Sequence, residues 1–268
     1  MQKQKVCLFV IDGQNDFVGR SKGSLVVNGA VGDMDRLASM INKHGAELDD
    51  IQLTMDSHYH MHIAHSSWWL DKNGNHPIPF TIITEDAMKT GEFRAYHKNL
   101  QKWSEHYVST LAKNNRYPLC IWPDHCIIGS MGQALDPVLF DAVTGWETRF
   151  YATAPRTTKG SNMYVEHYSV VKADVEHPSD PMTRLNTSMI DTLKIYDIIL
   201  TGGEALSHCV ANSARDIIAE FSPDQIKKFV LLEDATSSVT GFEKMGEDFI
   251  NEMTAKGMQL SRTDKFFR

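Results

Sequence analysis

Four histidines stand close together in the segment 54–67, TMDSHYHMHIAHSS: His58, His60, His62 and His65. Asp56 precedes the first of them by two residues. Imidazole nitrogens and carboxylate oxygens are ligands of zinc and other transition metals. A solvated polar loop would have the same composition, so a metal site requires further ligands from elsewhere in the chain.

Cys209 is the strongest candidate nucleophile. It lies in TGGEALSHCVANSARD, which predicts that it occupies the first turn of a helix after a strand and a glycine pair. The free N–H groups and the dipole of a helix N-terminus stabilise a thiolate. A buried structural cysteine is the alternative. The other cysteines, Cys7, Cys120 and Cys126, lie in or beside predicted strands, and we expect them in the core.

Two charged residues also stand at the ends of predicted strands or next to glycine. Asp12 follows the apolar run VCLFVI, and Lys159 lies in RTTKGSNMY. Taken singly, Asp12 could be a turn residue and Lys159 an exposed lysine. His125 follows LCIWPD. In a parallel α/β sheet, sites form at the carboxyl ends of the strands, which would bring such residues together.

Strand and helix patterns alternate along the chain, which predicts βαβ units with helices on both faces of a mainly parallel sheet. Short apolar runs typical of buried strands lie at 6–11, 51–55, 119–122, 197–202 and 228–234. Amphipathic stretches typical of helices lie at 34–48, 133–143, 209–221 and 244–257. We therefore expect a single α/β domain over 1–268, a three-layer doubly wound fold.

The segment at about 66–117 interrupts this alternation. It contains SSWWLDKNGNHPIPF and then EFRAYHKNLQKWSEHYVSTLAKNN, the pattern of a loop followed by a helix. We interpret it as an insertion that forms a lid or a subunit contact, with a surface excursion as the alternative.

The charge balance limits the partners. A formal net charge of −7 and a pI of about 5.9 argue against a broad nucleic-acid surface. The apolar run near the N-terminus is too short for a signal peptide or a membrane span. The cysteines show no disulfide framework. We expect a cytoplasmic protein with no membrane or nucleic-acid partner.

Five motifs in order resemble the nicotinamidase branch of the isochorismatase-like cysteine hydrolases. They are IDGQNDF (11–17), TMDSH (54–58), WPDHC (122–126), TKG (158–160) and GGEALSHCV (202–210). The resemblance spans nearly the whole chain except the insertion. It implies a sheet of about six strands and an amidohydrolase that converts nicotinamide to nicotinate and ammonia through a cysteine thioester.

The resemblance also implies a role for each matching residue. Asp12, Lys159 and Cys209 match the catalytic triad, and backbone N–H groups near Ala205 and Cys209 would form the oxyanion hole. The D-x-H motif and the histidine of W-P-x-H-C imply a set of metal ligands: Asp56, His58 and His125. Phe17 and Trp122 are candidate walls for a flat substrate ring, or else core residues.

The implied cofactor is one divalent metal ion, with zinc expected first and iron or manganese as alternatives. His65 resembles a nearby histidine that helps to hold the metal or its waters in some members, at a shifted spacing. We expect His60 and His62 to be bystanders on the approach to the site. The substrate would be a small-molecule amide, and a homo-oligomer is compatible with the resemblance.

Two residues depart from the family pattern. Glu204 stands where a small apolar residue is common, and His208 where an aromatic residue is common. The resemblance implies a non-proline cis peptide between Glu204 and Ala205. The departures leave substrate preference open: another small amide, a carbamoyl or a ureido compound is an alternative. A catalytically silent metal-binding scaffold is a further alternative.

Overall fold

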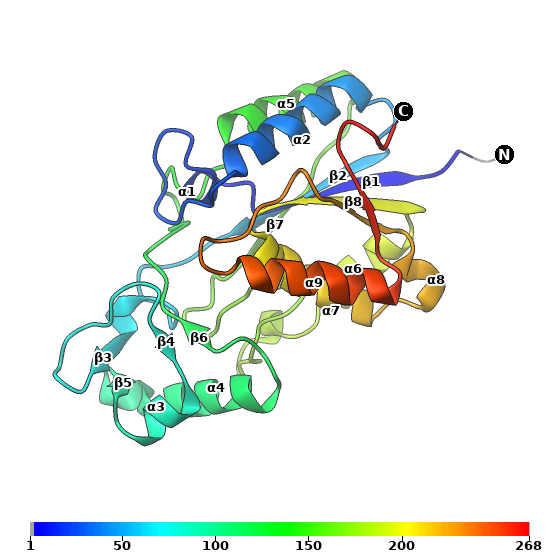
Figure 1. Ribbon diagram of the computed structural model, residues 1–268. Helices are drawn as coiled ribbons and strands as arrows, with labels where there is room; N and C mark the ends of the chain where they lie inside the picture. The colour runs from blue at the N-terminus through cyan, green and yellow to red at the C-terminus, as the bar shows by residue number, and fades with distance from the viewer. Residues whose placement is uncertain (1–2, 268) are drawn as a thin grey trace.

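The computed structural model describes residues 3–267, and its centre is a six-stranded sheet (Figure 1). All neighbouring strands of this sheet pair in parallel. In spatial order the strands are β10 (Gln259–Ser261), β9 (Phe229–Leu232), β8 (Ile198–Gly203), β1 (Val6–Ile11), β2 (Asp50–Asp56) and β7 (Arg156–Lys159). The predicted fold class is confirmed.

Four of the predicted apolar runs form strands of this sheet, namely β1, β2, β8 and β9. Every residue of β1 is buried, as a run covered by helices on both faces requires. The remaining two, β7 and β10, lie at the edges of the sheet and are short and more exposed.

The prediction that 119–122 forms a strand of the main sheet is wrong. Only Leu119–Cys120 (β6) is extended, and it pairs antiparallel with Ile82–Ile83 (β4) outside that sheet. The run is apolar because it is buried. Burial alone does not distinguish a sheet strand from another buried segment.

Helices cover both faces of the sheet, as predicted (Figure 1). On one face, α2 (Ala30–His44) packs against α5 (Pro137–Phe150). On the other, α7 (Ala211–Ala219) packs against α9 (Glu243–Lys256). The shorter helices are α1 (Asn15–Val18), α6 (Thr187–Lys194), α8 (Pro223–Ile226) and a 3-10 turn (Pro181–Thr183).

The segment 66–117 folds as a small α/β unit rather than a loop and one helix. Trp69–Asp71 (β3) pairs antiparallel with Phe93–Ala95 (β5). The unit's helices are α3 (Glu85–Lys89), α4 (Gln101–Lys113) and the 3-10 turns Ser66–Trp68 and Lys98–Leu100. Its interior holds the fully buried side chains of Trp68, Trp69 and Tyr107. The assignment of 1–268 to one domain stays a prediction.

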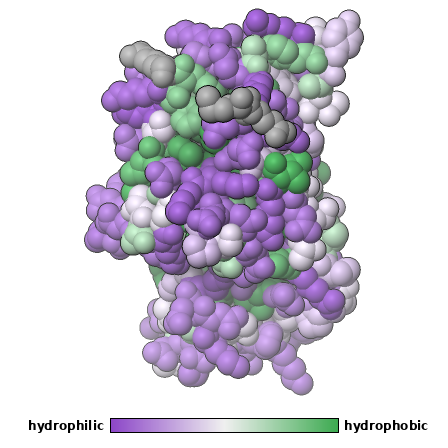
Figure 2. All heavy atoms as spheres, turned by 90° about the vertical axis from the view of Figure 1, so that its right-hand side faces the viewer, coloured by the Kyte–Doolittle hydropathy of each residue, from purple (hydrophilic) through white to green (hydrophobic). Residues whose placement is uncertain are grey.

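The surface is predominantly hydrophilic on the face shown in Figure 2, where apolar side chains form small separate areas. Within residues 3–267, no helix is both long and apolar enough to cross a membrane.

The strand order places the switch point of the sheet beside β1. From β1 the chain passes to β2 on one side, and later to β8 on the other. The carboxyl ends of β8, β1, β2 and β7 therefore lie next to one another, and a cleft at such a point is where doubly wound sheets bind ligands.

Candidate active site and metal centre

Four neighbouring strands each supply one residue of the candidate site. Asp56 and Lys159 are the last residues of β2 and β7 and are direct partners in the parallel register. Asp12 follows β1, and Cys209 follows β8. Three residues distant in sequence, an acid, an amine and a thiol, are thus close together in space.

Lys159 is the hub of this group. Its Nζ lies 2.9 Å from Oδ2 of Asp12, 3.0 Å from Oδ1 of Asp56 and 3.4 Å from Sγ of Cys209. It also donates to the carbonyl of His167 at 2.9 Å. Burial would lower the pKa of Lys159, but Asp12 and Asp56 hold it well above its usual value. The side chain is therefore a buried ammonium ion.

Asp12 is fully buried in a left-handed turn with φ 46°. Its Oδ1 accepts a hydrogen bond from Oγ1 of Thr54 at 2.5 Å, and its backbone N–H donates to the same residue. Burial raises the pKa of Asp12, against the lowering effect of Lys159. A carboxylate of raised basicity beside a thiol is suited to accept the thiol proton.

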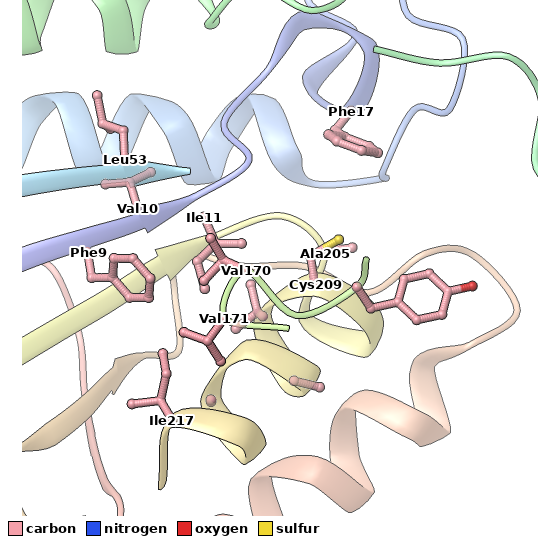
Figure 3. Packing of buried hydrophobic residues seen from close by; sticks show 14 of the residues in the cluster. Phe9, Val10, Ile11, Phe17, Leu53, Val170, Val171, Ala205, Cys209 and Ile217 are labelled. Carbon is pink, nitrogen blue, oxygen red and sulfur yellow. The ribbon is translucent and has the colours of Figure 1, made fainter. Parts of the chain in front are cut away.

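Cys209 lies in a π-helical turn, Leu206–Val210, that leads into α7, and it is 7% exposed. Figure 3 shows it beside Ala205 beyond the end of β1. Burial raises the pKa of the thiol well above its usual value; Lys159 lowers it, and Asp12 raises it further. The stabilisation of a thiolate by the helix N-terminus stays a prediction. The thiol needs a base.

The three predicted metal ligands form one cluster. Ligand atoms of Asp56, His58 and His125 all lie within 4.8 Å of one another, and all three residues are buried. Oδ2 of Asp56 is 2.9 Å from Nε2 of His58 and 3.3 Å from Nε2 of His125. Burial would raise the pKa of Asp56, but His58 and Lys159 hold it well below its usual range. The carboxylate is thus ionised, as a metal ligand must be.

Backbone carbonyls orient the histidine rings. Nδ1 of His58 donates to the carbonyl of Gly160 at 3.0 Å, and Nδ1 of His125 to that of Pro123 at 2.8 Å. A metal-binding histidine commonly donates its other nitrogen in this way, which fixes the free nitrogen towards the ion. Both Nε2 atoms therefore face Oδ2 of Asp56, which is itself a candidate ligand.

His65 shares this pattern. It is fully buried, and its Nδ1 donates to the carbonyl of His60 at 3.0 Å. Among the described residues its Nε2 has no hydrogen-bond partner. An unpaired buried nitrogen is costly unless something absent from the protein chain satisfies it. Its ring lies 5.5 Å from that of His58 and 5.7 Å from that of His125, but its ligand atoms are not within 4.8 Å of all three in the cluster, so its role as a further ligand stays a prediction.

Gly160 shapes the floor of the cluster. Its φ is 81°, and a Cβ atom there would lie 2.6 Å from Cε1 of His58 and 2.8 Å from Oδ1 of Asp56. Only glycine leaves room for both ligands, which gives a physical reason for the glycine of the TKG motif.

A second cluster of potential ligands contains His58, His62 and Glu166. His62 is less suited to bind a metal because both of its nitrogens are engaged: Nδ1 accepts from the N–H of Ala64 at 3.2 Å, and Nε2 donates to the carbonyl of Val165 at 3.0 Å. The expectation that His62 lies on the approach is wrong, since it is fully buried 4.3 Å from the His58 ring.

His60 fits the expectation of a bystander. Its side chain is exposed and pairs with Asp124.

Phe17 and Trp122 flank the site from different elements. Phe17 of α1 lies edge-on to His125, with 5.4 Å between ring centroids. Trp122 lies edge-on to His208 at 5.1 Å and donates from Nε1 to the hydroxyl of Tyr168 at 3.0 Å. Both are buried, and their role as walls of a substrate pocket stays a prediction.

Ala205 precedes the π-helical turn and has extended backbone. The peptide between Glu204 and Ala205 is cis, as the resemblance implies. Figure 3 shows Ala205 next to Cys209, so its backbone is near the sulfur of Cys209. The oxyanion role stays a prediction.

Several residues that support the site were not singled out from the sequence. Gln14 donates to the carbonyl of Asp56 at 2.7 Å and accepts from its N–H at 2.6 Å. Thr54 binds Asp12, and Glu166 lies 4.0 Å from His58. Gln14 and Thr54 both stand inside motifs already recognised, a signal that could have found them.

Comparison with known proteins gives a consistent result. The sequence is 27% identical over 216 residues to a nicotinamidase of Acinetobacter baylyi. The aligned region covers 80% of this chain and 75% of that protein. No family model matches the chain.

Three solved structures are similar in fold. A nicotinamidase/pyrazinamidase of Acinetobacter baumanii aligns with TM-score 0.64 at 21% identity over 98% of this chain and 99% of the other. A yeast nicotinamidase bound to the inhibitor nicotinaldehyde aligns with TM-score 0.65 at 18% identity over 96% and 99%. A pyrazinamidase of Pyrococcus horikoshii in complex with zinc aligns with TM-score 0.55 at 16% identity over 96% and 99%. The predicted resemblance to the nicotinamidase branch of the isochorismatase-like hydrolases is confirmed.

Proposed function

We propose that the chain is a metal-dependent cysteine amidohydrolase that converts nicotinamide to nicotinate and ammonia. The observation that carries this proposal is the contact of Lys159 with both Cys209 and Asp12, directly beside a set of metal ligands. The sequence similarity to a nicotinamidase supports the choice of substrate.

In the first step Asp12 takes the thiol proton of Cys209. The thiolate then forms beside the ammonium group of Lys159, which compensates its charge where burial excludes water. Because the thiol pKa is raised at rest, the proton leaves only when a base as close as Asp12 receives it.

The Cys209 sulfur next attacks the carboxamide carbon, and the carbonyl oxygen becomes an oxyanion. The backbone N–H groups of Ala205 and Cys209 donate to this oxyanion. Asp12 returns its proton to the amide nitrogen, the C–N bond breaks, and ammonia leaves behind a thioester.

Water completes the turnover. Asp12, again a carboxylate, takes a proton from water while the water oxygen adds to the thioester carbon. The C–S bond breaks and the Cys209 thiolate departs next to Lys159, releasing the carboxylic acid. Asp12 then returns the proton to the thiolate.

Asp56, His58, His125 and His65 would hold one divalent metal ion, and we expect zinc. The donor set of one carboxylate and three imidazoles suits zinc, iron(II) and manganese(II). When bound, the ion supplies a Lewis acid that can anchor the pyridine nitrogen of nicotinamide. Phe17 and Trp122 would enclose the flat ring.

The four cysteines are free and buried, in keeping with the cytoplasmic location that we propose.

Ammonia release from nicotinamide tests the proposal. The wild type should release ammonia, and Cys209→Ala should lower kcat by about 10⁴-fold or more, because the nucleophile is lost. Cys120→Ala, a buried cysteine in β6, is the matched control and should retain activity. Equal rates for the wild type and Cys209→Ala would eliminate the mechanism.

A panel of amide substrates tests whether the site recognises the ring nitrogen of nicotinamide. Nicotinamide and pyrazinamide present a ring nitrogen to the metal site, and benzamide does not. We expect benzamide to react with a much lower kcat/KM. A preference for an aliphatic or ureido amide over nicotinamide would instead favour the related small-amide hydrolases.

A further inference from the structure

Two buried carboxyl groups meet at the turn that leads to Cys209. Glu204 immediately precedes Ala205 and is fully buried, and Asp33 in the first turn of α2 is 2% exposed. Both side chains bind Ser237, whose N–H donates to Oε2 of Glu204 at 3.3 Å and whose Oγ donates to Oδ2 of Asp33 at 2.6 Å, so the two carboxyl groups adjoin the same residue. Two ionised carboxylates in contact, both out of water, repel each other strongly.

Arg36 is the one cation found beside this pair among residues 3–267. Arg36 donates to Oδ1 of Asp33 at 2.6 Å, and its side chain is 44% exposed. The segment after β9 contributes Ser237, which does not titrate. At the end of β1, Asp12 accepts a hydrogen bond from Thr54 and forms an ion pair with Lys159. One positive charge cannot neutralise two carboxylates, so the pair needs a proton.

The geometry indicates which residue holds that proton. Asp33 accepts from Arg36 at 2.6 Å and from Oγ of Ser237 at 2.6 Å, and it lies in the first turn of α2, where negative charge is stabilised. Glu204 accepts one long hydrogen bond, from the N–H of Ser237 at 3.3 Å, and its Oε1 has no partner among the described residues. Asp33 is the better-supported anion.

We propose that Glu204 is a positioning residue that stays protonated at neutral pH and donates to Asp33, fastening the turn before Cys209 to α2. Burial, together with the nearby Asp33 charge, raises the pKa of Glu204 well above its usual value. That direction agrees with the proton on Glu204.

The fastened turn is the one that carries the predicted oxyanion donor. The N–H of Glu204 donates to the carbonyl of Ile11 at 2.7 Å, and the N–H of Leu206 to that of Ser237 at 2.8 Å. The backbone before Ala205 is therefore tied to the end of β1, which precedes Asp12, and the backbone after it to the segment that follows β9. The protonated side chain adds a third tie, to α2. This catalytic consequence rests on the proposed amidase function.

The pH dependence of folding tests the proton itself. A carboxyl whose pKa is raised by folding contributes stability that is present at acid pH, below its unfolded pKa, and lost as the pH rises towards the folded pKa. Glu204→Gln carries a permanent donor and has no proton to lose. We expect the unfolding constant of the wild type to rise about tenfold per pH unit relative to Glu204→Gln between about pH 5 and 7.

The control is Glu220→Gln, an exposed glutamate just after α7, which should run parallel to the wild type. Glu204→Leu also removes the titrating proton, and it replaces Glu204→Gln in the unfolding comparison if Glu204→Gln does not fold. Unfolding constants that change with pH equally in the wild type and in these Glu204 variants would overturn the proposal.

Activity separates positioning from stability. Glu204→Leu should lower kcat for nicotinamide by about ten- to a hundredfold with KM changed less than about threefold, because it loosens the turn. Glu204→Gln should restore kcat and hold it to higher pH than the wild type. An equal loss in both variants would overturn the positioning role. If Cys209→Ala is also fully active, the proposed function fails, whereas the unfolding data still test the proton.

Discussion

Nζ of Lys159 lies 3.4 Å from Sγ of Cys209 and 2.9 Å from Oδ2 of Asp12. Lys159 and Asp12 act on the thiol in opposite directions: the ammonium group of Lys159 lowers the thiol pKa, and the carboxylate of Asp12 raises it. Burial of the sulfur is the largest cause of its raised pKa and keeps it protonated at rest, next to the base and the counter-ion that it needs during reaction. The predictions for Asp12 and Lys159 depend on these effects.

Asp12→Asn should separate thiol reactivity from catalysis. Loss of the carboxylate removes a charge that raises the pKa of Cys209, so the thiolate forms at lower pH and a small neutral alkylating reagent should react faster at pH 7. Ammonia release should nevertheless fall by about 10³-fold or more, because the base is gone. Slower alkylation of Asp12→Asn than of the wild type would contradict this account.

Lys159→Met should damage both activity and stability. Asp12 and Asp56 would lose the cation between them, and breaking a buried ion pair costs about 3–5 kcal/mol. We expect kcat/KM to fall by about 10³-fold, and chemical denaturation to measure the lost stability. Lys172→Met, which removes a half-buried lysine paired with Asp216, is the control and should keep its activity.

His65→Ala tests the fourth ligand. The buried, unpaired Nε2 of His65 predicts that this variant binds zinc about 10- to 100-fold more weakly than the wild type. His60→Ala, which removes an exposed neighbour, should bind zinc normally. Metal titration of the apo protein measures both constants without any assay of activity. Equal zinc affinities for His65→Ala and the wild type would exclude His65 from the metal site.

Gly160→Ala tests the close packing beneath the ligands. The added methyl group would overlap His58 and Asp56, and φ of 81° is strained for alanine. We expect a loss of about 1–3 kcal/mol in unfolding free energy and weaker zinc binding. Gly145→Ala, in α5 with open space around its Cβ position, should be neutral or slightly stabilising. Equal effects of the two substitutions would contradict the packing argument.

The fully covered strands of the sheet could be predicted from the sequence because they are continuous apolar runs. The edge strand β7 could not, since Arg156–Lys159 is polar and faces solvent in part. Its last residue, Lys159, was found only through the family motif. The segment 119–122 was misassigned because a buried apolar run is equally suited to a short antiparallel pair.

The candidate site was predicted residue by residue where a motif fixed the chemistry, and missed where tertiary contacts decide the role. His62 and His65 look alike in TMDSHYHMHIAHSS. They differ in their partners. The carbonyl of Val165, about a hundred residues away, accepts from Nε2 of His62, and Nδ1 of His62 is bound by Ala64, so neither ring nitrogen of His62 is free. The pairing of Glu204 with Asp33 likewise joins distant segments, and no local pattern predicts it.

The most direct test is to trap the covalent intermediate. The wild-type protein, turning over ring-deuterated nicotinamide, is quenched in acid and digested, and its cysteine peptides are analysed by mass spectrometry. The account predicts a deuterated nicotinoyl group on Cys209 and on no other cysteine, absent from Cys209→Ala. Steady release of ammonia with no acyl group on Cys209, or with the group on another residue, would contradict it.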